Sequence, residues 1–284
     1  MNGCKVRPAP LRITQQEARS LRAQRGQAIS EFIVIAPLLL FFCFAMVQFV
    51  LLYQAKATLD VATLEAVRAG AVSHGSMAAM QDGLARGLAP LHARRADGDG
   101  MQAALQRAKI DAARFSSITI VNPTREMSSD FARPRFYPAE GVSHVEIPND
   151  TLMYRNPSPG MRSRVGIQDA NLLKIRVHYC YDLYVPLVNK VLYYAVNVIG
   201  NVAPNGLFAR EPADAEGDVF GAPRRPDTLC RIRLADGIAT SRWPLALESE
   251  AIVRMQSPFR AEAAHDTDSL ARPADAAAPV RMRR

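Results

Sequence analysis

The most apolar stretch of the chain runs from Phe32 to Tyr53 without a charged side chain. As a helix, these 22 residues would span about 33 Å, against a bilayer hydrocarbon core of about 30 Å. A helix in the core of a soluble protein rarely stays apolar on every side over this length. The pattern therefore predicts one membrane span, over about residues 32–53.

Helical spacing continues beyond this span to about Leu91. Small and apolar residues recur there every three or four positions: Leu59, Ala62, Thr63, Ala66, Val67 and Gly70. Such a narrow face allows another backbone to approach closely. It could pack into a filament or against a partner, or it could pack on this protein's own sheet. Several glycines between residues 70 and 87 predict breaks, and Ala89-Pro90 predicts the end of the helix.

Helical and alternating patterns follow one another after residue 92. We expect a helix over 101–115, strands over 117–122, 142–147, 171–184 and 245–255, and a helix over 186–199. Residues 123–141 are expected to be irregular, and 148–170 and 201–242 to be loops. In the clearest strand, 171–184, apolar and polar side chains alternate, as in an antiparallel strand with one face on a core. The predicted fold class is α+β: a long N-terminal membrane-spanning helix, then a head with a small antiparallel sheet and packed helices.

The composition excludes several other classes of protein. Hydrophobic residues make up 49% of the chain and charged residues 22%, which excludes a wholly disordered chain. The formal charge is +8, but residues 1–26 hold six basic residues and one acidic residue, a net +5. Because the excess precedes the span, it indicates a cytoplasmic N-terminus and a C-terminus outside the cytoplasm rather than nucleic-acid binding.

The junction between this basic leader and the span has its own pattern. Gly26 lies before Gln27, and Glu31 stands directly before the apolar run. If the chain were cut after Gly26, the new α-amine of Gln27 could pair with Glu31 of a neighbouring helix inside lipid. Alternatively, Glu31 lies among headgroups and only marks the end of the span. A cleaved secretory signal, with Ala55-Lys56-Ala57 as its small-residue site, fits less well because the apolar run is too long.

These residues match a known family. The stretch 25–72 resembles the N-terminal module of TadE-like proteins, the minor pilins or pseudopilins of tight-adherence (Flp-type) pilus systems in bacteria. The resemblance is carried by Gly26, the Glu31-Phe32 pair, Ala36-Pro37 within the span, and the small-residue segment 66–71. Residues 243–257 are also similar to longer members of the family. Flp major pilins tend to have Glu-Tyr where this chain has Glu31-Phe32.

The resemblance implies processing by a prepilin peptidase after Gly26, with Gln27 as the new first residue and Glu31-Phe32 completing the motif. It also implies an inner-membrane location before assembly. The expected partners are other pilins and pseudopilins, pilus assembly components, the prepilin peptidase and the lipid bilayer.

Motifs for catalysis or metal binding are not found in the sequence. Its five histidines form no HExxH pair, and it contains no nucleophile elbow, Walker A motif or CxxC pair. Glu248 and Glu250 share one strand face with Arg254, which favours cross-strand ion pairs over acid–base chemistry. We therefore expect no enzyme activity, metal or cofactor. Cys180 and Cys230 both lie beyond the span, where disulfides form. They are expected either to form a disulfide or to be two separately buried thiols.

The sequence divides into a basic cytoplasmic leader (1–26), a TadE-like helix (27–91), a periplasmic α+β head (92–259) and a disordered tail (260–284). The leading hypothesis is a pseudopilin that acts in assembly of a tight-adherence pilus. The alternative is an uncleaved single-span envelope protein that binds pilus or secretion components without entering a filament.

Overall fold

A computed structural model describes residues 15–196, 230, 233–235 and 243–265 of the chain, with side chains from residue 29 on except residues 30 and 265. The chain forms two units, residues 1–47 and 48–284. By its contacts, the part of α1 from Gln48 on belongs to the second unit. The division into leader, helix, head and tail at residues 26, 91 and 259 stays a prediction. From here on, the head means the described residues of 48–265.

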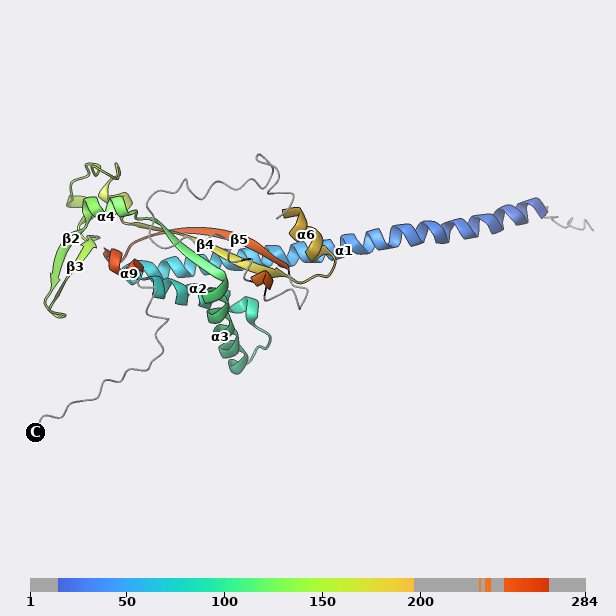
Figure 1. The fold of residues 1–284 in the computed structure, drawn as a ribbon, viewed down its shortest axis with the longest axis horizontal. Coiled ribbons are helices and arrows are strands. Elements are labelled where there is room, and N and C mark those ends of the chain that lie inside the picture. The colour runs from blue at the N-terminus through green and yellow to red at the C-terminus, as the bar shows by residue number, and fades with distance from the viewer. Residues whose placement is uncertain (1–14, 197–229, 231–232, 236–242, 266–284) are drawn as a thin grey trace, which may run out of the picture. The chain divides into compact units, whose positions relative to one another are not determined.

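The fold is α+β, as the sequence predicted (Figure 1). The helices are α1 (Gln15–Val72), α2 (Met77–His92), α3 (Gly98–Phe115), α4 (Arg125–Phe131), α5 (Ile167–Ala170), α6 (Val188–Tyr194) and α9 (Ala261–His265), with a 3-10 turn η1 (Leu152–Tyr154). The strands are β1 (Ser116–Asn122), β2 (Arg133–Tyr137), β3 (Val142–Ile147), β4 (Leu172–Leu183), β5 (Trp243–Arg254) and β6 (Phe259–Arg260).

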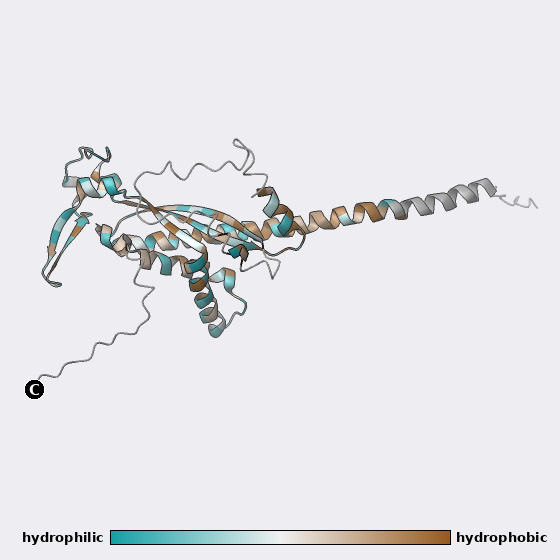
Figure 2. Ribbon diagram, viewed as in Figure 1, coloured by the Kyte–Doolittle hydropathy of each residue, from teal (hydrophilic) through white to brown (hydrophobic). Residues whose placement is uncertain are grey.

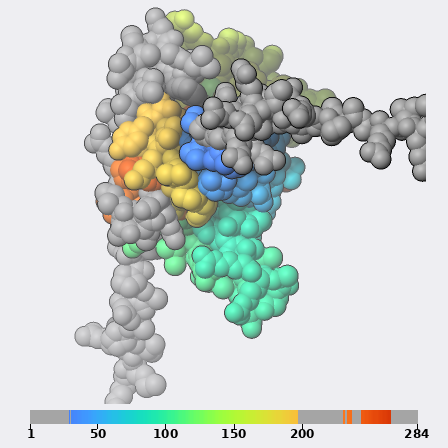
Figure 3. Space-filling model, turned by 90° about the vertical axis from the view of Figure 1, so that its right-hand side faces the viewer, coloured from blue at the N-terminus to red at the C-terminus, as the bar shows by residue number. Residues whose placement is uncertain are grey.

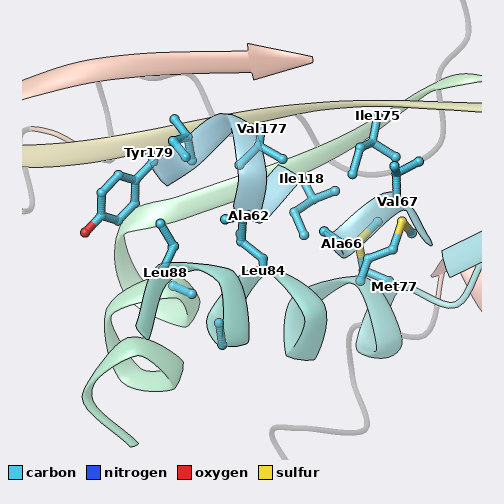
Figure 4. Packing of buried hydrophobic residues seen from close by; sticks show 14 of the residues in the cluster. Ala62, Ala66, Val67, Met77, Leu84, Leu88, Ile118, Ile175, Val177 and Tyr179 are labelled. Carbon is cyan, nitrogen blue, oxygen red and sulfur yellow. The ribbon is translucent and has the colours of Figure 1, made fainter. Parts of the chain in front are cut away.

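The main sheet has the order β1-β4-β5, and both strand pairs are antiparallel. The predicted alternation is confirmed in the first part of β4, where Leu173, Ile175 and Val177 are fully buried and the residues between them are partly exposed. It does not hold from residue 179 to residue 183, because Cys180 and Asp182, expected on the polar face, are buried as well. The buried face of the sheet packs on α1 and α2, and these elements form one continuous apolar core (Figure 4). β4 lies in the centre of the sheet because its period-two pattern supplies the apolar face that the two helices cover.

The second sheet has the order β2-β3-β6, and it corrects one expectation. Residues 123–141 are not irregular, because they form α4 and β2. The side chain of Thr124 caps α4 by accepting a hydrogen bond from the backbone N–H of Met127. Pro134 is tolerated in β2 because this strand lies at the edge of the sheet, where an N–H can be missing. β2 is stabilised by pairing with β3, and local sequence patterns do not reveal that partner.

The break between α1 and α2 lies at residues 73–76. Gly75 has φ +78°, and a Cβ there would lie 2.5 Å from the ring of Phe259, so both conformation and space require glycine. Contrary to expectation, Gly70, Gly83 and Gly87 lie inside helices, and α2 includes Pro90.

Several other boundaries differ from those predicted. The helix expected over 186–199 is α6 where the chain is described, and residues 260–265, expected to begin the tail, belong to β6 and α9. The loop predicted over 148–170 contains η1 and α5. Most of the loop predicted over 201–242, the tail beyond residue 265 and residues 1–14 of the leader lie outside the described residues.

Candidate functional site: the apolar helix and its attachment to the head

Between Ile29 and Val47, most residues of α1 are hydrophobic (Figure 2), and most of their side chains are exposed. Phe32 is 68% exposed, Val34 74% and Met46 70%. Within the described part of the chain, α1 is the one helix long and apolar enough to cross a membrane. A core helix of a soluble protein would bury such side chains, because each exposed one forfeits apolar burial. This segment therefore fits a single-pass membrane anchor.

The four residues predicted for peptidase processing all lie within α1: Gly26, Gln27, Glu31 and Phe32. Glu31 and Phe32 are exposed. Positions 27 and 31 are one helical turn apart, so they lie on the same side of the helix, separated by a rise of about 6 Å. This spacing brings a new α-amine at Gln27 and the Glu31 carboxylate to the same helix surface. Cleavage itself remains a prediction.

Gln48 is the first residue of the head, and our sequence reasoning missed it. Its side chain is fully buried, and Oε1 accepts a hydrogen bond of 2.9 Å from the backbone N–H of Val185, just after β4. The sequence carried a signal, because Gln48 is the one amide side chain between Phe32 and Tyr53. A buried amide in an apolar run indicates a specific hydrogen-bonded neighbour. The head is thus attached to α1 within the predicted span, five residues before its end at Tyr53.

The small-residue face of α1 packs inside the head rather than facing outward. Ala62 and Ala66 are fully buried against α2. A Cβ on Gly87 would lie 2.3 Å from Ala62 Cα, and a Cβ on Gly83 would lie 2.9 Å from Ala66 Cα. The two backbones are therefore as close as glycine allows. Of the two readings that the sequence left open, packing within this chain is the one observed (Figure 4).

Polar side chains also fasten α1 to the main sheet. Lys56 Nζ donates to Asp60 Oδ1 at 2.5 Å and to the backbone oxygen of Glu248 in β5 at 2.7 Å. Asp60 in turn accepts a hydrogen bond of 2.7 Å from Ser249 Oγ. Burial alone would raise the pKa of Asp60, but the hydrogen bonds from Lys56 and Ser249 outweigh it and lower that pKa. The carboxylate therefore stays charged while it joins helix and strand.

The acidic pair on β5 forms cross-strand ion pairs with β4, as the sequence analysis expected. Glu250 contacts Lys174 Nζ at 2.7 Å, and Glu248 contacts Arg176 Nε at 2.9 Å. Arg176 also pairs with Glu250, and His178 Nε2 lies 3.3 Å from Glu248. Burial would raise the pKa of Glu250, but hydrogen bonds from Lys174 and Arg176 outweigh it and lower that pKa. These carboxylates hold two strands together and are matched by cations.

Cys180 and Cys230 are joined by a disulfide, with Cα atoms 5.5 Å apart. The bridge ties Cys230 to the second half of β4. Arg233, three residues later in the sequence, donates to Asp182 through Nε at 2.8 Å and to Asp111 through Nη1 at 2.9 Å. Its guanidinium also lies over the ring of Phe115, 4.5 Å from the centroid. One disulfide and one buried arginine therefore hold Cys230 and Arg233 to the head, and of the two, sequence reasoning proposed only the disulfide.

A cluster of titratable side chains surrounds Arg233, and its groups are matched to one another. Asp111 accepts hydrogen bonds from Arg233 and from Tyr179, and His92 Nε2 lies 3.6 Å from its second oxygen. Burial would raise the pKa of Asp111, but His92, Arg233 and Tyr179 together lower it. Burial and the neighbouring Asp111 charge raise the pKa of Tyr179 well above its usual value. The proton thus stays on the phenol and the charge on the carboxylate, which suits a structural clamp and not proton transfer.

Metal-ligating groups do not gather elsewhere in the described part of the chain. No three His, Cys, Asp or Glu side chains there are placed to hold an ion. The features that distinguish the described part of the chain are the exposed apolar part of α1 and the packing of α1 from Gln48 on within the head.

Comparison with known families bears directly on this helix. Residues 26–68 match the family model described as TadE-like protein. The TadE-like match begins at the predicted cleavage position, covers the whole predicted span and ends in the small-residue face. It confirms the resemblance for this segment. TadE-like proteins are a pilin-like structural family, so the match and the apolar helix together support a pilus-associated, membrane-anchored protein. Neither the curated proteins nor the solved structures include a match to this chain.

Proposed function

We propose that this chain is a pseudopilin that acts in the assembly of a tight-adherence (Flp) pilus. Residues 32–53 anchor it in the bacterial inner membrane, with a cytoplasmic N-terminus and a periplasmic head. The observation that carries this proposal is the coincidence of the TadE-like match at 26–68 with an apolar helix whose side chains face outward. The basic leader supports the orientation, because positive residues stay on the cytoplasmic side.

α1 has an exposed apolar part before Gln48 and a part that is buried in the head, and this difference indicates which part meets other subunits. From Leu59 to Gly70, its small-residue face is buried under α2 and the main sheet. Lateral packing with other pilins is therefore assigned to the exposed residues between Ile29 and Val47. In lipid, such packing is driven by close van der Waals contact and by matched polar groups. This division leaves the disulfide-bonded head free to meet pilus components in the periplasm.

Glu31 provides the matched polar group in this mechanism. A carboxylate beside hydrocarbon requires a proton, water or a cation. After cleavage by a prepilin peptidase at Gly26, the α-amine of Gln27 on an adjacent helix supplies that cation. The attraction is stronger than in water because the surrounding dielectric constant is low. Only a cleaved subunit has this α-amine, so only cleaved subunits would pair with Glu31 of a neighbouring helix.

The test is surface piliation in cells that carry Glu31→Gln at normal protein level. We expect the span to insert and the pili to be lost or strongly reduced, because an amide cannot balance the neighbouring ammonium. Glu65→Gln is the matched control, since Glu65 lies on the same helix but in the head, half-exposed and 3.8 Å from Arg86. Glu65→Gln should leave piliation normal. Normal piliation with Glu31→Gln would overturn the mechanism.

N-terminal sequencing of the native protein separates this proposal from its alternative. Gln27 as the first residue supports a processed pseudopilin, and Gly26→Leu should then leave the leader attached. Met1 as the first residue would instead favour the uncleaved envelope protein that binds pilus or secretion components without entering a filament.

A further inference from the structure

Helix α6 exposes large apolar side chains on one face, although Val188 and Asn189 on its other side are buried. Val191 is 54% exposed and Tyr194 52%, and their spacing of three residues places them on one face of α6. Leu187, the residue directly before the helix, is 66% exposed. Tyr184, just before the helix, is 56% exposed. Asn189, on the opposite side, is buried. We call the four exposed residues, Tyr184, Leu187, Val191 and Tyr194, the α6 face.

The α6 face lies at the level of the apolar run in α1. The hydrogen bond from Val185 to Gln48 Oε1 fixes the start of this segment beside the first residue of the head. From Gln48 to Tyr53, α1 rises by about 7.5 Å and is still apolar. Phe49, Val50 and Tyr53 are 57%, 66% and 77% exposed, so the helix at this level is itself unsheltered. Whatever surrounds α1 at residues 48–53 therefore also reaches α6.

Next to the α6 face are the side chains that membrane interfaces favour. Trp243, the one tryptophan of the chain, packs its ring 5.0 Å from that of Tyr193 and 5.7 Å from that of Tyr194. Lys190, exposed on α6, places Nζ 5.7 Å from the centre of the Trp243 ring. Helix α6 contacts β5, and Figure 3 shows the gold atoms of β4 and α6 next to a small orange patch. Tyrosine and tryptophan accumulate at the headgroup level, and lysine there meets anionic lipid.

We propose that the α6 face is a second membrane contact, inserted in the outer interface of the bilayer that holds the span. The inference rests on the proposed anchoring of residues 32–53. The occupant is lipid because the α6 face lies at the level of the exposed apolar residues Phe49, Val50 and Tyr53, and because Lys190 and Trp243 match a headgroup layer. With two contacts, α1 and α6, the head is held at one height and one tilt above the membrane. A single helix would leave the head free to swing and rotate.

The test places one fluorophore at a time on the full-length chain in phosphatidylethanolamine and phosphatidylglycerol vesicles. The background is Cys4→Ser with Cys43→Ser, which leaves only the disulfide pair. Val191→Cys carries the probe on the α6 face. Ile110→Cys is the matched control, because Ile110 is also an exposed apolar residue on a helix, at 60%. Val50→Cys reports the anchor. Trp243 fluorescence checks that each variant is folded, and Tyr194→Cys replaces Val191→Cys if that variant is not.

Quenching by lipids with a spin label near the headgroup gives the result. We expect quenching at position 191 to be comparable to that at 50 and several-fold greater than at 110. If position 50 is quenched and 191 behaves like 110, the α6 contact is refuted while the anchor stands. If 191 is shielded from both lipid quencher and aqueous iodide, a protein partner covers the face and the assignment to lipid is overturned. If position 50 is not quenched either, the proposed anchoring fails and this inference falls with it.

Discussion

Replacing Gly87 by alanine should destabilise the head, although alanine is the better helix former. Gly87 lies within α2, opposite Ala62 of α1. The added Cβ would meet Ala62 Cα at 2.3 Å and Ala62 Cβ at 2.6 Å, whereas ordinary contacts are 3.4–4 Å. Because the nearest atom is backbone, no rotation of a side chain relieves the overlap. The two helices must instead separate by about 1 Å, which loosens the packing around Leu84 and Leu88.

The size of the destabilisation by Gly87→Ala follows from two opposing effects on the free energy of unfolding. Overpacking of a core costs about 1–3 kcal/mol, and the alanine gains up to about 1 kcal/mol of helix propensity over glycine. The overlap at Gly87 is severe, so we expect a net loss of about 1–2 kcal/mol in the free energy of unfolding. For a domain of this size, the melting temperature should fall by about 2–8 °C. Gly83→Ala, with its closest contact at 2.9 Å, should lose less.

The assay is denaturant and thermal unfolding of the detergent-solubilised full-length chain, followed by fluorescence of its single tryptophan, Trp243. Gly98→Ala is the control, because a Cβ at that helical glycine would meet nothing within 4 Å. Stability should therefore decrease in the order Gly98→Ala, Gly83→Ala, Gly87→Ala. A Gly87→Ala protein as stable as Gly98→Ala would show that α1 and α2 are not in close backbone contact and would refute the reasoning.

Three further predictions concern the disulfide, a buried tyrosine and the orientation. Mass spectrometry of non-reduced peptides should find Cys180 linked to Cys230, and free thiols at both positions in protein from the cell envelope would contradict the bond. Replacing both cysteines by alanine should lower the free energy of unfolding by roughly 4 kcal/mol, the value of the chain-entropy model for this 50-residue separation. Burial, with the nearby Tyr184 and Asp182, raises the pKa of Tyr181 to about 12 from 10.0. The stability that the protonated Tyr181 phenol contributes should thus be complete below pH 10 and lost as the pH rises to about 12. Alkaline unfolding of Tyr181→Phe compared with the parent protein checks this pH dependence. Identical unfolding profiles for the two proteins would contradict it. A reporter fused after residue 284 should be active only if it works in the periplasm, and activity of a cytoplasm-only reporter would reverse the topology.

The sequence by itself determined those features that depend on neighbours along the chain. The span from Phe32 to Tyr53 is a matter of length and hydropathy, and the TadE-like resemblance confirmed in this segment depends on closely spaced residues. The alternation in β4 likewise marked its buried face, because a strand turns successive side chains to opposite sides. The same two cysteines that the sequence singled out are paired in the structure, since they alone lie beyond the span.

The tertiary structure decided what each buried face meets. A small-residue stripe such as Ala62 and Ala66 has the same appearance whether a neighbouring subunit or the chain's own α2 covers it. β2 required β3 as a partner before residues 133–137 could be recognised as a strand. Gln48 and Arg233 gained their roles from Val185 and Asp182, which lie far away in sequence. Periodicity reports that a surface is buried, but the covering surface is chosen by long-range contacts that only the folded chain brings together.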